Sequence, residues 1–125
     1  MSEASKRSRT TILVVEDNGE LRSAYRRELK ERGYCVMTAE DNEEALERVE
    51  CLHCDLPALI LTDLQLPTLD RLVDQAREHD RLREVPIVTI TYDHTGVSHD
   101  GVQVLEDYEQ LDGLLKSGQS KVEVL

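Results

Sequence analysis

Apolar residues recur along this chain with two alternating periods. Residues 11–15 form a continuous apolar and β-branched run, as expected for a strand that is buried on both faces of a parallel sheet. Between positions 19 and 32 the apolar residues fall at helical spacing, and Gly33 follows as a C-terminal stop. The chain therefore begins with a predicted strand and a predicted amphipathic helix.

The same alternation continues toward the C-terminus. A second strand is expected over 34–38, and Asp41 and Glu44 stand in capping-box register for a second helix. The remaining expected elements are a strand over 58–62, a helix around 69–76, a strand over 86–90, a short strand over 102–105 and a closing helix that ends near Gly118. Strands and helices that alternate with short connections predict an α/β domain with a parallel sheet and right-handed crossovers.

One crossover departs from this rhythm. Residues 92–101 are polar and too few for a full helical connection between parallel strands. We therefore expect the fourth crossover helix to be shortened or missing. The domain itself is expected to span residues 11–118, between a flexible tail over 1–10 and a C-terminal tail over 119–125.

Composition and charge narrow the possible functions. The chain has 125 residues, which allow one domain with a core, and its 15 Lys and Arg against 26 Asp and Glu give a net charge of −11. This balance argues against a nucleic-acid partner. The sequence contains no signal peptide and no apolar stretch of transmembrane length, so we expect a cytoplasmic protein without a membrane partner. Cys51 and Cys54 have half the spacing of a zinc site, but ordinary buried thiols are the simpler interpretation.

Three acidic residues follow the predicted strands and suggest chemistry. Glu16 and Asp17 come directly after the first strand, and Asp63 comes directly after the third. Ligands bind outside the carboxyl ends of the strands in an open parallel sheet, so these carboxylates are expected to converge. Clustered carboxylates suit Mg²⁺, and a carboxylate beside Mg²⁺ can act as a nucleophile toward phosphorus.

Three segments in this order resemble the receiver domains of bacterial two-component response regulators. They are ILVVEDN at 12–18, LILTDLQLP at 59–67 and PIVTIT at 86–91. The resemblance covers about residues 11–116. It implies a flavodoxin-like, three-layer α/β/α sandwich whose five parallel strands have the order 2-1-3-4-5.

The resemblance also implies roles for single residues. Asp63 would be the phosphoacceptor, and the hydroxyl of Thr91 would hydrogen-bond the phosphoryl group. Mg²⁺ would be bound by Asp17, by Asp63, by the backbone carbonyl of Gln65 and, through water, by Glu16. These residues carry the family's metal and acceptor chemistry.

The chain departs from the family on the opposite side of this site. The family places a lysine just after the fifth strand, where the best alignment puts Asp107. The aromatic residue that often partners the threonine in this family aligns with Val104. The cation that would pair with the phosphoryl group is therefore replaced by an anion.

The leading functional hypothesis is a stand-alone response regulator that is not itself an enzyme. It would accept a phosphoryl group from a sensor histidine kinase or a histidine phosphotransfer protein, with the helix face near Asn18, Leu21 and Ala24 meeting that partner. Output would be by protein contact, since no effector domain is expected after Leu125.

Three alternatives stand beside this hypothesis. A degenerate receiver would keep the fold and serve as an interaction module without phosphorylation. A haloacid-dehalogenase-type phosphatase should have a second aspartate where Gln65 stands. A flavodoxin should have small and hydroxyl residues in its first loop, where this chain has Glu16 and Asp17.

Overall fold

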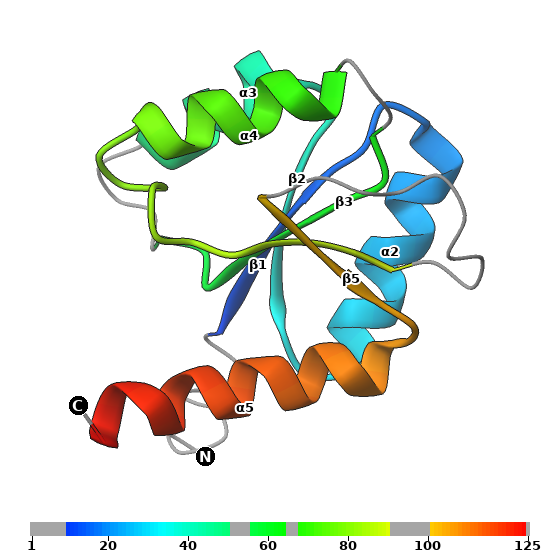
Figure 1. Cartoon of the computed structure of the whole chain (residues 1–125). Helices are drawn as coiled ribbons and strands as arrows, with labels where there is room; N and C mark the ends of the chain where they lie inside the picture. Colours follow the sequence, from blue (N-terminus) through cyan, green and yellow to red (C-terminus); the bar gives the residue numbers. More distant parts are fainter. Residues whose placement is uncertain (1–9, 51–55, 65–67, 91–100, 125) are drawn as a thin grey trace.

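A computed structural model of the chain describes residues 10–50, 56–64, 68–90 and 101–124, and it shows a parallel sheet between two pairs of helices (Figure 1). The strands are β1 (Thr11–Val15), β2 (Cys35–Ala39), β3 (Leu59–Thr62), β4 (Ile87–Ile90) and β5 (Val102–Leu105). The helices are α2 (Gly19–Glu31), α3 (Asn42–Glu50), α4 (Thr68–Glu78) and α5 (Tyr108–Val124). The strand order is β2-β1-β3-β4-β5 with every pair parallel, which confirms the predicted flavodoxin-like topology.

Local capping explains where α2 begins and ends and where α3 begins. The Asn18 side chain accepts a hydrogen bond from the Leu21 N–H at 3.0 Å, which satisfies one of the free donors at the start of α2. Gly33 has a φ of 97°, the left-handed conformation that ends a helix and that favours glycine. For α3, the Glu44 N–H donates to the Asp41 carboxylate at 2.8 Å, as the capping-box spacing predicted.

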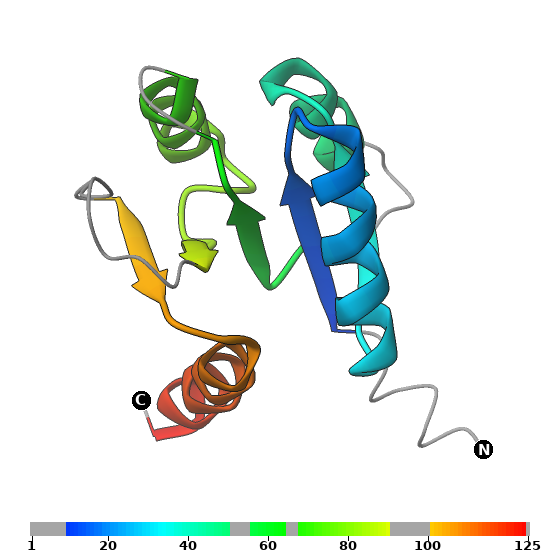
Figure 2. The same cartoon turned by 90° about the vertical axis from the view of Figure 1, so that its right-hand side faces the viewer.

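Alternate residues of the central strands belong to two separate hydrophobic cores. Leu13 and Val15 of β1 pack under α3 and α4, where Val49 and Val73 are fully buried. The even-numbered residues pack under α2 and α5, where Leu29 and Leu111 are fully buried. The two helix pairs therefore cover opposite faces of the sheet. In Figure 2, which looks from the side of α2, this helix lies in front of β1. Burial on both faces accounts for the continuous apolar runs in the sequence.

One detail of the predicted elements was wrong. Helix α5 continues to Val124 rather than ending near Gly118, because a glycine in a right-handed helix costs only about 1 kcal/mol and does not stop it. Leu21 and Ala24, on the face of α2 that is expected to meet a partner, are both exposed. No helix in the part of the chain described, α5 included, has the length and hydropathy to cross a membrane. The prediction of a shortened fourth helix concerns residues 92–101, of which 92–100 lie outside that part.

Gly101, just before β5, lies against α4 without room for a side chain. A Cβ atom built at this position would lie 2.5 Å from Val73 Cγ1 and 2.5 Å from Arg77 Nη2. Arginine can move its flexible end, but Val73 is fully buried in the core and cannot. The close approach of β5 to α4 therefore requires glycine at position 101.

We expect Gly101→Ala to lower the free energy of unfolding by about 1–3 kcal/mol, the usual cost of overpacking a core. Gly113→Ala is the matched control, because a Cβ there meets nothing within 4 Å and the residue lies inside α5. This control should raise the free energy of unfolding by about 0.5–1 kcal/mol through helix propensity. Urea unfolding of both variants measures the two effects. Equal stability of the two variants would contradict the steric argument.

Candidate functional site

Neighbouring strands bring the predicted acidic residues to one edge of the sheet. Val15 and Thr62 are partners in the parallel pairing of β1 with β3, so the residues that follow them emerge side by side. Glu16, Asp17 and Asp63 are close enough for their charges to interact. Two other predicted site residues, Gln65 and Thr91, lie outside the residues that the structure describes.

Glu16 is an acidic side chain in a buried position. It is only 3% exposed, and its Oε2 accepts a hydrogen bond from the Asn18 N–H at 3.0 Å. Its Oε1 is buried and has no hydrogen-bond partner among the residues that the structure describes. Burial raises the pKa of the Glu16 carboxyl above its usual value, and the neighbouring charges of Asp63 and Asp17 add to the rise. A buried carboxylate oxygen without a partner is costly unless a cation or a water satisfies it.

Asp63 is half-buried at the end of β3. The Thr62 hydroxyl oxygen accepts a hydrogen bond from the Leu64 N–H at 3.1 Å, and the Leu64 side chain packs into the core. The chain is thus anchored on both sides of the aspartate. Burial raises the pKa of the Asp63 carboxyl, a hydrogen bond from Tyr25 lowers it, and the nearby Asp17 charge raises it.

Tyr25 is a neighbour of the site that the sequence did not reveal. It stands among the apolar positions of α2, and its ring packs against the core cluster beneath α2 and α5. It lies near enough to Asp63 for each of the two groups to shift the pKa of the other. Burial and then the Asp63 charge raise the pKa of Tyr25 above its usual value, so the phenol keeps its proton. The available signal was a hydroxyl-bearing residue on an otherwise apolar helix stripe.

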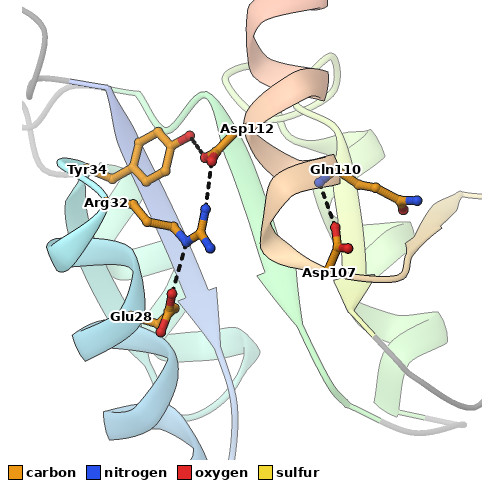
Figure 3. A network of polar contacts seen from close by, with 6 residues as sticks. All are labelled: Glu28, Arg32, Tyr34, Asp107, Gln110 and Asp112. Atoms are coloured by element: carbon orange, nitrogen blue, oxygen red, sulfur yellow. Dashed lines mark hydrogen bonds and ion pairs between the residues drawn. The ribbon is translucent and has the colours of Figure 1, made fainter.

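Asp107, aligned with the lysine of the family, caps a helix in this structure. Its carboxylate accepts a hydrogen bond from the Gln110 N–H at 2.9 Å, at the first turn of α5 (Figure 3). The Gln110 side chain in turn accepts from the Glu106 N–H at 2.7 Å. The three-residue spacing repeats that of Asp41 and Glu44, so the cap could have been read from the sequence. The Asp107 carboxylate thus serves the start of α5.

We expect Asp107→Ala to lower the free energy of unfolding by about 0.5–2 kcal/mol, the usual loss for a helix N-cap. Asp107→Asn should leave stability nearly unchanged, because asparagine caps as well as aspartate. Asp107→Lys should cost at least as much as alanine, since it also places a cation at the positive end of the helix. Thermal or urea unfolding ranks the three variants. An asparagine variant as unstable as the alanine variant would argue against the capping role.

A second polar network ties α5 to the region where α2 ends. Arg32, the C-cap of α2, pairs with Glu28 at 3.0 Å and with Asp112 of α5 at 2.7 Å (Figure 3). The Tyr34 hydroxyl also hydrogen-bonds Asp112, and the Arg32 guanidinium lies 5.2 Å from the centre of the Tyr108 ring. The network links α5 to the end of α2, and the Arg32 guanidinium is paired with Glu28 and Asp112.

The donor set fits a hard divalent cation, but it is not arranged around one. Carboxylate oxygens are the ligands that Mg²⁺ prefers, and a metal-bound water can satisfy Glu16 Oε1, which has no hydrogen-bond partner in the described part of the chain. Within residues 10–50, 56–64, 68–90 and 101–124, no three His, Cys, Asp or Glu side chains are grouped to hold a metal. Asp17 is exposed at this edge of the sheet. Cation binding would also relieve the repulsion between the carboxylates.

Comparison with known proteins gives a consistent family. A family model of the response regulator receiver domain matches residues 12–121. The chain is 33% identical over 92 residues to hybrid signal transduction histidine kinase D of Dictyostelium discoideum, a match that covers 72% of this chain and 6% of that protein. It is 35% identical over 80 residues to the alkaline phosphatase synthesis transcriptional regulatory protein PhoP of Bacillus subtilis, covering 64% of this chain and 32% of that protein. The chain thus spans a third or less of these two relatives.

Solved structures with the same fold include receiver domains of sensor kinases. The receiver domain of the hybrid histidine kinase CckA is 32% identical, with a TM-score of 0.62 over 86% of this chain and 96% of that one. The receiver domain of the sensor histidine kinase PA1611 from Pseudomonas aeruginosa PAO1 is 21% identical, with a TM-score of 0.65 over 87% and 96%. That structure has a magnesium ion coordinated in its active site cleft.

Proposed function

This chain belongs to the response regulator receiver domain family, and from that premise we propose that it accepts a phosphoryl group on Asp63 in a Mg²⁺-dependent reaction. The observation that carries the proposal is the half-buried Asp63 carboxylate at the end of β3, beside the acidic pair at the end of β1. Phosphoryl transfer asks a protein mainly for positioning and charge neutralisation. The anchored Asp63 carboxylate provides the positioning. Because the site is acidic and partly buried, charge neutralisation requires a cation.

The proposed metal ligands are Asp17, Asp63 and the backbone carbonyl of Gln65, with Glu16 acting through water. When bound, Mg²⁺ would neutralise these carboxylates and hold the incoming phosphoryl oxygens. Asp63 would supply the nucleophilic oxygen. A bond forms between this oxygen and phosphorus, the phosphorus–nitrogen bond of a phosphohistidine donor breaks, and the imidazole leaves with that electron pair.

The proposed phosphodonor is a sensor histidine kinase or a histidine phosphotransfer protein that docks on α2. Leu21 is 42% exposed on this helix, beside the exposed Ala24. Farther along the helix, Arg26, Arg27 and Lys30 line a shallow hollow. An exposed apolar residue with cations farther along the same helix suits a partner with an apolar contact and acidic side chains on one side of it. Output would follow through protein contact or by passing the phosphoryl group on.

The second candidate function is a degenerate receiver that binds a partner without phosphorylation. The observation that favours it is the use of Asp107 as a helix cap, which leaves no cation at the position of the family's lysine. The half-buried Asp63 favours the first candidate. Burying a carboxylate costs free energy, and such a cost is expected where the carboxylate has a function.

Incubation with a small phosphodonor and Mg²⁺, followed by mass spectrometry of intact protein and peptides, tests the two candidates. Acceptor function predicts one added phosphoryl group, located on Asp63 and dependent on the metal. A protein that binds Mg²⁺ but gains no phosphoryl group from either a small phosphodonor or a phosphorylated phosphotransfer protein would favour the degenerate receiver.

A further inference from the structure

The two peptide groups that flank Asp17 are each held by a hydrogen bond. The Glu16 carbonyl accepts from the Arg22 guanidinium at 2.8 Å, and the Asn18 N–H donates to Glu16 Oε2 at 3.0 Å. A peptide unit is planar, so a bond that holds its carbonyl also restrains the Cα atom of the next residue. The backbone of Asp17 is therefore restrained on both sides, although the residue itself is exposed.

Arg22 reaches this carbonyl from near the start of α2. Its backbone N–H donates to the Asn18 carbonyl at 2.9 Å, as in a regular helix. Long side chains on a helix lean toward its N-terminus, which brings the guanidinium back beside Gly19, where a Cβ atom would lie 3.7 Å from Nη2. Arg22 is half-buried there, whereas Arg26, one turn farther along, is exposed. The Arg22 side chain thus lies against the connection between β1 and α2.

Glu16 is the residue at which the sheet stops holding this connection. Its N–H donates to the Ala39 carbonyl of β2 at 3.0 Å, but the pairing of β1 with both neighbouring strands ends at Val15. Its carbonyl accepts from a side chain instead of from a strand. The guanidinium therefore extends the backbone hydrogen bonding of β1 by one residue.

Arg22 contacts the loop through a carbonyl and not through a carboxylate. Within the described ranges it forms no ion pair. The positive end of the α2 dipole disfavours a cation here, and the hydrogen bond offsets that cost. Hydrogen bonds from charged donors are among the stronger ones in proteins, so this contact can hold the peptide in place.

We propose that Arg22 is a positioning residue for the metal site. By holding the Glu16 carbonyl, it fixes the main chain that carries Asp17 before a cation arrives. The inference rests on the proposed Mg²⁺ site. A ligand that is already ordered loses little conformational freedom when the metal binds, so the metal binds more tightly.

Positioning and charge predict opposite effects on Mg²⁺ affinity. A guanidinium near the site repels Mg²⁺, so removing it would strengthen binding if its charge were the dominant effect. If its hydrogen bond positions Asp17, removing it weakens binding even though a like charge has gone. The sign of the change therefore distinguishes the two roles.

Arg22→Met tests the proposal, because methionine keeps a long side chain on the helix and removes every donor. Mg²⁺ affinity, measured by calorimetric titration, should fall about tenfold, the lower end of the usual loss when a residue that orients a metal ligand is removed. In labelling with a small phosphodonor, the loss should appear in the Mg²⁺ concentration that gives half the maximal rate and not in the rate at saturating Mg²⁺. Arg22→Lys, which keeps a donor and the charge, should recover part of the affinity.

Arg26→Met is the matched control, since it removes an exposed cation from the same helix and changes the net charge equally. Its Mg²⁺ affinity should equal or slightly exceed that of wild type, because solvent screens the lost charge. NMR relaxation of the Asp17 amide in the metal-free protein gives a readout that does not depend on the metal. This amide should be more mobile in Arg22→Met than in wild type or in Arg26→Met.

Each outcome separates the inference from the proposed function. If wild type binds Mg²⁺ and is labelled on Asp63, an unchanged or higher Mg²⁺ affinity in Arg22→Met would overturn the inference and leave the acceptor role of Asp63 standing. So would an equal loss of affinity in Arg26→Met, or a loss in Arg22→Met that appears only in the rate at saturating Mg²⁺. A wild-type protein that binds no Mg²⁺ and is never labelled would overturn the proposed function and, with it, the role of Arg22.

Discussion

Asp63→Asn is expected to abolish phosphoryl labelling and, at the same time, to make the metal-free domain more stable. Asparagine preserves the shape of the side chain but provides no nucleophilic carboxylate oxygen, so the phosphoryl group has no acceptor. It also removes a charge that burial and the neighbouring Asp17 make unfavourable. Loss of activity together with a gain in stability is the combination expected at a functional site.

The gain in stability should depend on pH. The pKa of Asp63 is raised in the folded protein above its ordinary value of 3.8, so the folded state binds this proton more tightly than the unfolded chain does. The stability that this group contributes is therefore present below about 3.8 and is lost as the pH rises through the folded pKa. Asp63→Asn should then exceed wild type in thermal midpoint at pH 7, and the difference should shrink toward pH 3.

The matched control is Asp74→Asn, an exposed aspartate on α4. This variant should be labelled like wild type and should change the thermal midpoint little, because solvent screens its charge. Full labelling of Asp63→Asn would identify a different acceptor residue. A fall in the midpoint of Asp63→Asn at pH 7 in the absence of metal would contradict the electrostatic account of the site.

Much of the fold could be predicted from the sequence because its signals are local. The apolar run at 11–15 is continuous because β1 has helices on both of its faces, and Asp41 with Glu44 marks the start of α3 within four residues. The strand order came from the resemblance to a known family, and the structure confirms it. Periodicity alone does not distinguish one arrangement of five parallel strands from another.

What the sequence missed depends on contacts between distant segments. Helical spacing identifies Tyr25 as a residue of the inward stripe of α2, but it does not show that Tyr25 lies near enough to Asp63, 38 positions later at the end of β3, to shift its pKa. This proximity follows from the packing of α2 against the sheet, which only the tertiary structure provides.

Asp107 has a local role that the alignment did not indicate. The alignment places this residue at the position of the family's lysine. The structure shows that its carboxylate accepts a hydrogen bond from the Gln110 N–H at the start of α5. The departure from the family is therefore the absence of a cation, with the carboxylate held by the helix.

Asp17→Ala is expected to weaken Mg²⁺ binding at least tenfold. In the proposed site Asp17 is a direct ligand, and the loss of one charge-assisted contact costs about 1.5–3 kcal/mol, where each 1.4 kcal/mol is a factor of about ten. The wild-type domain should gain about 2.7 kcal/mol of stability at a Mg²⁺ concentration 100 times its dissociation constant, and the variant should gain much less at the same concentration. Calorimetric titration and thermal unfolding with Mg²⁺ measure the two effects independently.

Two further variants make this prediction specific to the site. Glu20→Ala removes an exposed carboxylate from the first turn of α2 and changes the net charge equally, so it should leave Mg²⁺ affinity near that of wild type. Glu16→Gln should weaken binding by less than Asp17→Ala, because Glu16 is proposed to act through water. The glutamine would place a neutral amide oxygen or nitrogen where the buried Oε1 has no partner among the described residues. Equal Mg²⁺ affinities for wild type and Asp17→Ala would show that Asp17 is not a ligand of the metal. A loss of affinity in Glu20→Ala equal to that in Asp17→Ala would show that the effect comes from net charge alone.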